Sequence, residues 1–161
     1  MRSIVAALCV AVSHVGQTQT PSAGPPFTTR GAFFALSVAN VDSSARWYAE
    51  KFGLTVTMRA PKTNGASATV LEGGGLIVEL IQRDDAMPLS AAAPSLTASY
   101  RVHGFFKAGI VVDDFEKTLR DLRARGVEVA IGPFAATAEQ RANVIVRDNA
   151  GNLIQIFGAK R

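Results

Sequence analysis

Few side chains in this 161-residue chain could do chemistry, and they lie in separate apolar segments rather than in one motif. Glu79 stands in the apolar run after three glycines, Lys107 precedes a second run, and Gln155 interrupts the last one. The only cysteine is Cys9, and only one histidine, His103, lies beyond residue 30. A Ser-His-Asp or Cys-His catalytic triad therefore cannot be assembled from the chain beyond residue 30.

Composition indicates one globular domain, because 48% of the residues are hydrophobic and 19% are charged. The formal net charge is +4, and the basic residues alternate with acids, as in DDFEKTLRDLRAR at residues 113–125. This alternation is typical of an exposed helix face rather than of a nucleic-acid-binding patch. We therefore expect no nucleic acid among the partners.

The N-terminal residues 1–29 are typical of a signal peptide and a disordered tether. Arg2 precedes the apolar stretch Ile4 to Val12, which is too short to cross a bilayer, and small residues suited to cleavage follow. We expect export to the periplasm or the extracellular space, with no membrane attachment after cleavage. An apolar segment that packs against the domain is the alternative. Cleavage would also remove Cys9, so no disulfide is expected.

The rest of the chain repeats itself. FFALSVANVDSSARWYAEKFGLTV at residues 33–56 and FFKAGIVVDDFEKTLRDLRARGVEV at 105–129 each predict a strand, a capped amphipathic helix, a glycine stop and a second strand. Two further strands close each half, so the order is βαβββ twice. We expect an α+β fold with one domain over residues 30–161: module 1 at about 30–83, a linker at about 83–100 and module 2 at about 101–161.

Side chains point alternately to the two sides of each strand, so the sequence predicts which side is buried under a helix and which side is not. Sets such as Phe34, Leu36 and Val38 suit burial under a helix. The opposite sets contain polar or small residues, which suits a concave, partly hydrated surface. The side chains on that surface that we select as ligand-binding candidates are Phe33, Ser37, Ile77, Glu79, Lys107, Gln155 and Phe157.

The doubled pattern resembles the vicinal oxygen chelate superfamily, which includes glyoxalase I, extradiol dioxygenases, fosfomycin-resistance enzymes and bleomycin-resistance proteins. The segments that carry the resemblance are FFALSVANVDSSARWYAEKFGL, GGGLIVELIQ, AGIVVDDFEKTLRDLRARGVEV and RDNAGNLIQIF. The resemblance implies that the two modules form a curled mixed sheet whose cup binds a ligand. It also implies a homodimer in which the two chains share their cups.

Metal-using members of that superfamily place ligands at four strand positions. The resemblance carries these positions onto Phe33, Glu79, Lys107 and Gln155. Only Glu79 is a good ligand, because phenylalanine offers no lone pair, a protonated lysine repels a cation, and a glutamine carbonyl binds metals weakly. We therefore expect no metal and no cofactor.

An ion pair between Glu79 and Lys107 could replace the metal, within one chain or across a dimer, with Gln155 hydrogen-bonded to it or to a ligand. A buried pair need not add stability, but removal of one partner is expensive. In the alternative, Lys107 lies at the mouth of the cup and extends its ammonium group into water.

Two classes of function remain open. One is a metal-free binder of a small organic molecule, since apolar walls with a few polar groups suit such a ligand. The other is a lyase, isomerase or dioxygenase-type enzyme, which either recruits a metal, for instance through His103 and Glu79, or uses Glu79 or Lys107 as a general acid or base. An interaction domain that kept the fold without a ligand is a third possibility.

We predict that the purified protein, after removal of residues 1–29, contains no stoichiometric metal. Elemental analysis should find no equivalent of zinc, nickel, manganese or iron, and added divalent ions should not raise the melting temperature. One bound equivalent of any of these metals per chain would contradict the metal-free interpretation.

Overall fold

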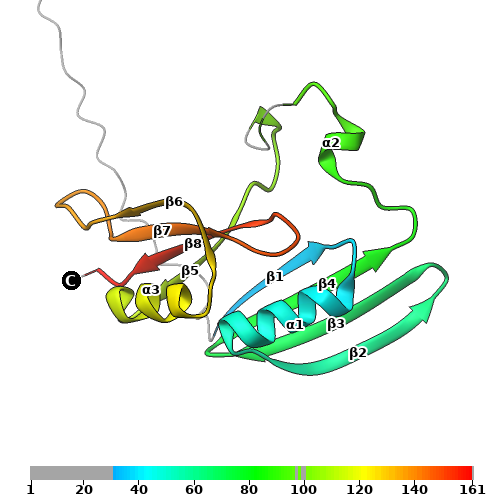
Figure 1. The fold of residues 1–161 in the computed structure, drawn as a ribbon, viewed down its shortest axis with the longest axis horizontal. Coiled ribbons are helices and arrows are strands. Elements are labelled where there is room, and N and C mark those ends of the chain that lie inside the picture. Colours follow the sequence, from blue (N-terminus) through cyan, green and yellow to red (C-terminus); the bar gives the residue numbers. More distant parts are fainter. Residues whose placement is uncertain (1–30, 97, 99–100, 161) are drawn as a thin grey trace, which may run out of the picture.

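The computed structural model describes residues 31–96, 98 and 101–160 (Figure 1). The first module contains β1 (Ala32–Ser37), α1 (Val41–Phe52), β2 (Thr55–Thr63), β3 (Ala66–Gly73) and β4 (Leu76–Arg83). The second contains β5 (Ala108–Val112), α3 (Phe115–Ala124), β6 (Glu128–Phe134), β7 (Asn143–Arg147) and β8 (Leu153–Gly158). The α+β fold of two βαβββ modules is thus confirmed. The expected signal peptide and tether lie outside the described residues.

Each module forms its own four-stranded mixed sheet, in the orders β1-β4-β3-β2 and β5-β8-β7-β6. The parallel pairs are β1 with β4 and β5 with β8, and the other neighbours are antiparallel. Within the described ranges, no strand pairing joins one sheet to the other, so β1 and β5 are edge strands. The chain therefore has two sheets that do not close into one.

A long connection separates the two sheets and includes a feature that the sequence did not predict. A short helix, α2 (Leu89–Ala92), lies in the linker expected at about residues 83–100. No helix in the described part of the chain is long and apolar enough to cross a membrane.

The predicted helix boundaries are confirmed by their caps. Asn40 accepts a hydrogen bond from the Ser43 amide through Oδ1 at 2.8 Å, and Asp114 accepts one from the Lys117 amide at 2.8 Å. These bonds satisfy backbone donors that have no partner inside the helix. Helix α1 ends at Gly53, whose φ of 72° lies in the left-handed region that glycine adopts without strain.

The predicted burial pattern is also confirmed. Helix-facing side chains of β1, β4 and β8 form one apolar cluster with residues of both helices. These strand residues are Phe34, Leu36, Val78, Leu80, Ile154 and Ile156, none more than 7% exposed. Because successive strand residues point to opposite faces, the residues between them must lie on the sides of the sheets away from the helices.

Helix α1 joins the first module to the second. The Tyr48 hydroxyl, on a side chain with no exposed surface, donates a hydrogen bond to Oδ2 of Asp148 at 3.0 Å. Asp148 lies in the turn between β7 and β8 and also accepts hydrogen bonds from the Ala150 and Asn152 amides at 2.9 and 2.8 Å. The same carboxylate therefore shapes the last turn of one module and holds the helix of the other.

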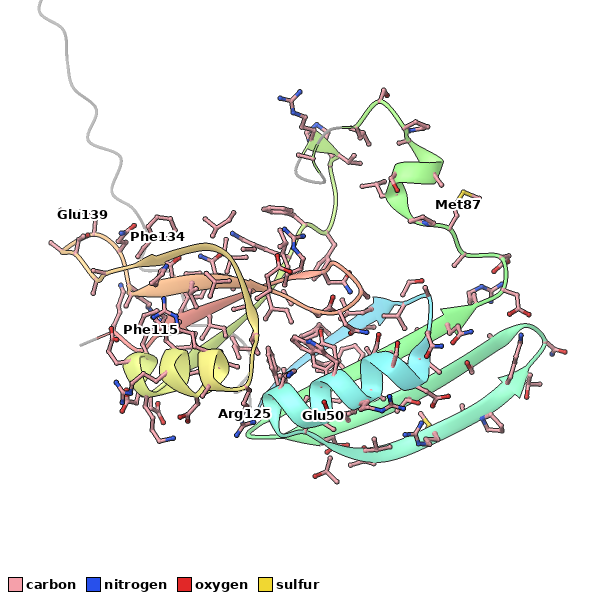
Figure 2. The ribbon with its side chains drawn as sticks, viewed as in Figure 1. Glu50, Met87, Phe115, Arg125, Phe134 and Glu139 are labelled. Carbon is pink, nitrogen blue, oxygen red and sulfur yellow. The ribbon has the colours of Figure 1, made fainter. Side chains whose placement is uncertain are left out.

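A second connection lies at the ends of the two helices. The Lys51 ammonium donates to the backbone carbonyl of Arg125, and the Arg125 guanidinium donates to the carbonyl of Lys51 at 3.1 Å. Figure 2 shows Arg125 at the end of α3 that faces α1. These bonds are exposed and contribute less than the buried Tyr48 contact.

We predict that Tyr48→Phe lowers the free energy of unfolding by about 1–3 kcal/mol at neutral pH, because it leaves Asp148 short of one buried donor. Burial, followed by the charge of Asp148 and the hydrogen bond to it, raises the pKa of Tyr48 well above its ordinary value of 10.0. The native state therefore retains a proton that the unfolded state loses in alkali, so this stabilisation is complete below the unfolded pKa and declines above it. Urea unfolding of both proteins measures the difference.

At one pH unit above 10.0, the difference between the wild type and Tyr48→Phe should shrink by about 1.4 kcal/mol. A difference that stays constant from neutral to alkaline pH would contradict this role of the hydroxyl.

Candidate functional site

We call the side of each sheet that lies opposite its helix the open face of that sheet. The open face of the second sheet presents two rows of residues. One row crosses the strands through Gly109, Gln155, Ile145 and Ile131. The next row contains Val111, Phe157, Asn143 and Phe134. Directly opposed residues point to the same face of a sheet, so Gln155 and Phe157 lie on the open face, as the alternation predicted.

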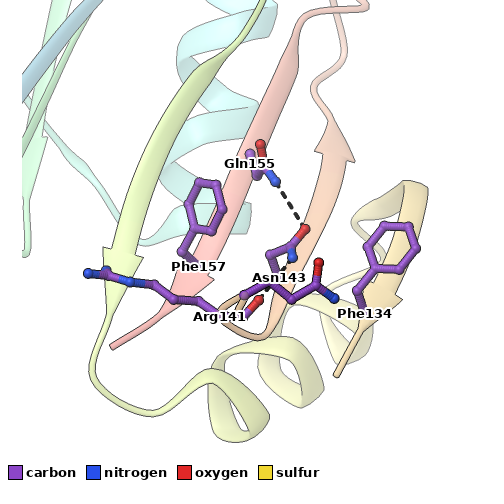
Figure 3. Close-up of a pocket in the computed structure, with 6 residues that line it drawn as sticks. Phe134, Arg141, Asn143, Gln155 and Phe157 are labelled. Carbon is purple, nitrogen blue, oxygen red and sulfur yellow. Dashed lines mark hydrogen bonds between the residues drawn. The ribbon is translucent and has the colours of Figure 1, made fainter. Parts of the chain in front are cut away.

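A pocket of about 410 Å³ lies on this open face (Figure 3). Two aromatic rings, three carboxamides and one guanidinium line it: Phe134, Gln140, Arg141, Asn143, Gln155 and Phe157. Figure 3 shows Phe157 and Phe134 on either side of the Gln155–Asn143 pair. Gly109 pairs with Gln155 across β5 and β8, and a Cβ added there would lie 3.7 Å from Cε2 of Phe157, so the Phe157 ring lies beside this glycine.

The polar groups of the pocket form a chain of hydrogen bonds. Gln155 donates through Nε2 to Oδ1 of Asn143 at 3.0 Å. Asn143 donates in turn through Nδ2 to the backbone carbonyl of Arg141 at 3.0 Å. Asn143 is only 8% exposed, so its side chain is fixed by both partners. Gln155, which interrupts the last apolar run of the chain, is thus held on the open face by a second amide.

The seven predicted ligand-binding residues do not share one cup within a single chain. Gln155 and Phe157 line the pocket of the second module. Phe33 and Ile77 line a different pocket of about 530 Å³, beside the turn between β3 and β4 in the first module. Ser37, Glu79 and Lys107 line neither pocket. The reason is topological, because each module keeps its own sheet and its own open face.

The proposed ion pair is not formed within the chain. Glu79 lies opposite Ala35 on the open face of the first sheet, half-buried, and its carboxylate has no partner among the described residues. Lys107 immediately precedes β5, and its Nζ lies 5.3 Å from the centre of the Phe106 ring, within the range of a cation–π contact. A pair formed across two chains stays a hypothesis.

Glu79 and Gln155 occupy the same place in the two modules. Glu79 pairs with Ala35, five residues before the cap Asn40, and Gln155 pairs with Gly109, five residues before the cap Asp114. The repeat thus carries a carboxylate in one half and its neutral amide counterpart in the other.

The residues at the four metal positions implied by the resemblance do not fit a divalent ion. In the described ranges, no three His, Cys, Asp or Glu side chains come together in a group that could hold one. Phe33 offers no lone pair, Lys107 is a cation over an aromatic ring, and Gln155 already donates to Asn143. A donor set of one carboxylate and one amide carbonyl is too weak to hold a metal.

Sequence reasoning missed four residues of the pocket: Phe134, Gln140, Arg141 and Asn143. Phe134 follows the irregular pairing between β6 and β7, where simple alternation fails. Asn143 could have been found, because counting across the last hairpin from Gln155 places it two residues from Ile145 on the same side. The positions of Gln140 and Arg141 depend on the path that residues 135–142 take between β6 and β7.

A family model described as the Glyoxalase/Bleomycin resistance protein/Dioxygenase superfamily matches residues 31–156. No curated protein sequence matches the chain. A glyoxylase/bleomycin resistance protein/dioxygenase domain from Frankia sp. EAN1pec has a TM-score of 0.63 at 19% identity, covering 83% of this chain and 100% of that one.

Two further solved structures share the fold. TnmS3, an antibiotic binding protein from Streptomyces sp. CB03234, has a TM-score of 0.58 at 18% identity and covers 83% of this chain and 97% of its own. Glyoxalase I from Zea mays has a TM-score of 0.59 at 15% identity over 83% of this chain. The match covers 46% of the maize chain, so this chain spans about half its length.

We predict that Glu79→Gln and Lys107→Met each change the free energy of unfolding by less than about 1 kcal/mol in dilute protein, because neither side chain has an ionic partner among the described residues. Urea unfolding over a dilution series measures this. A loss of about 3–5 kcal/mol that develops as concentration rises would instead indicate a buried pair across two chains.

Proposed function

The chain belongs to the Glyoxalase/Bleomycin resistance protein/Dioxygenase superfamily, and we propose that it binds a small organic molecule on the open face of its second module. The observation that carries the proposal is the composition of the pocket formed there. Two phenylalanine rings offer flat apolar surfaces, and the carboxamides offer fixed hydrogen-bonding groups. Such a combination suits an organic ligand recognised by stacking and a few directed polar contacts.

The polar groups at the pocket favour binding over reaction. Of the residues that the structure describes, no carboxylate, imidazole or thiol lines it, so the side chains there supply neither a general acid or base near neutral pH nor a nucleophile. They also supply no strong ligand for a metal. Similarity of fold to a protein described as antibiotic binding agrees with a binding role.

The proposal includes a second copy of the chain and export from the cell. Large apolar side chains on the open faces remain uncovered in a single chain, with Phe33 at 60% and Val111 at 59% exposed. A homodimer that places one open face over another would bury them and enclose the ligand. Export rests on the composition of residues 1–29 alone.

A second candidate is an enzyme that uses Glu79 as a general acid or base. The observation in its favour is a half-buried carboxylate without a partner on the open face of the first sheet. In that case, Glu79→Gln would abolish turnover of a bound compound, whereas a binding protein would return the compound unchanged.

We predict that Phe157→Ala weakens the binding of an aromatic probe by about tenfold, since loss of one stacked ring removes about 1–3 kcal/mol. Displacement of the fluorescent dye anilinonaphthalene sulfonate by hydroxynaphthoic acid measures the affinity. Phe134→Ala should act in the same direction because its ring lies on the other side of the pocket.

Phe105→Ala is the matched control, because Phe105 is 75% exposed and lines neither pocket. Equal affinities of the wild type and both pocket variants would show that the probe does not bind between these rings.

A further inference from the structure

We infer that the ligand is a planar aromatic molecule, neutral or anionic, that carries a hydroxyl or amino hydrogen-bond donor and directs it to Oε1 of Gln155. This inference rests on the proposed function, because it concerns the same pocket. It assigns the ligand's chemical class and makes Asn143 a positioning residue for the amide that selects it.

The orientation of both amides follows from one backbone carbonyl. The carbonyl of Arg141 can only accept a hydrogen bond, so the group of Asn143 that faces it must be the Nδ2 donor. Oδ1 of Asn143 then faces Gln155, and an oxygen can only accept. Gln155 must therefore present Nε2 to Asn143, which leaves Oε1 as the acceptor of this amide that no described residue engages.

This Oε1 is an acceptor that a ligand can reach. Among the described residues, every fully buried side-chain oxygen or nitrogen has a hydrogen-bond partner. Oε1 of Gln155 has no partner among these residues, so this oxygen is not fully buried and solvent can reach it. Gly109, directly beside Gln155 in the sheet, contributes no side chain that could cover it. Water satisfies the oxygen in the free protein, and any ligand that seals the pocket must replace that water with a donor of its own.

A ligand that brings an ether or carbonyl oxygen to this place would leave two acceptors facing each other. Selection by an unpaired polar group is stronger than selection by apolar shape, because the desolvated group is left without compensation. The pocket should therefore discriminate a hydroxyl from a methoxyl group even when the two molecules are otherwise alike.

The charge and shape of the ligand follow from the remaining lining residues. Arg141 is the one ionised side chain among the six, and within the described part of the chain its guanidinium has no hydrogen bond or ion pair. A cationic ligand would be repelled, whereas a carboxylate or phenolate would be attracted. The rings of Phe157 and Phe134 flank the amide pair, which favours a flat molecule between them (Figure 3).

The test compares hydroxynaphthoic acid with its methyl ether, methoxynaphthoic acid, by calorimetry or dye displacement on the full chain. We expect the wild type to bind the hydroxyl compound about tenfold more tightly. Gln155→Met, which keeps the length of the side chain and removes the acceptor, should bring the two affinities to within about twofold. Circular dichroism confirms that each variant is folded.

Asn143→Leu tests the positioning role separately. The Gln155 amide can then rotate and present either its donor or its acceptor, so the preference should fall while both compounds still bind. Phe157→Ala should weaken both compounds equally and leave their ratio unchanged. A preference retained in Gln155→Met or in Asn143→Leu would overturn the inference.

The outcomes separate this inference from the proposed function. If the wild type binds both compounds equally, and Phe157→Ala weakens both, the pocket binds aromatic molecules. The inference that the ligand must donate a hydrogen bond to Gln155 is then wrong. If the wild type binds neither compound, the proposed function is overturned for this ligand class, and the inference is overturned with it.

Discussion

The buried hydrogen bond between Tyr48 and Asp148 is the interaction on which the arrangement of the two modules depends. Tyr48 lies on the helix of the first module, and Asp148 opens the hairpin that carries Gln155 in the second. The carboxylate is already committed to the backbone of its own turn through Ala150 and Asn152. Helix α1 is therefore anchored to a turn whose shape is set by its own backbone hydrogen bonds. This anchor fixes where the second sheet, with its open face, lies relative to α1.

Local sequence rules predicted most of the fold because the interactions behind them are local. Caps such as Asn40 and Asp114 act within one helical turn, and alternation decides the burial of Phe34 or Ile154 within one strand. The separation into two unjoined sheets was not predictable in the same way. Pairing between β1 and β5 would involve residues far apart in the chain, and no local pattern specifies it.

The candidate site was predicted only in part, for the same physical reason. Alternation placed Gln155 and Phe157 on the correct side of the sheet, but it could not supply their partners. Asn143 and Arg141 reach them by hairpin register and by the path of the preceding loop. Glu79 and Lys107 were paired in the hypothesis because both suit the same side of a shared cup, and a single chain has no shared cup.

The orientation of the two hydrogen-bonded amides in the pocket is set by the backbone. Which atom of Gln155 meets a ligand is decided by the backbone carbonyl of Arg141, two hydrogen bonds away, through the side chain of Asn143. A change in loop length before Asn143 that replaced this carbonyl with an N–H group would reverse both amides at once. Evolution could then invert the polarity demanded of the ligand while every side chain lining the pocket stayed the same.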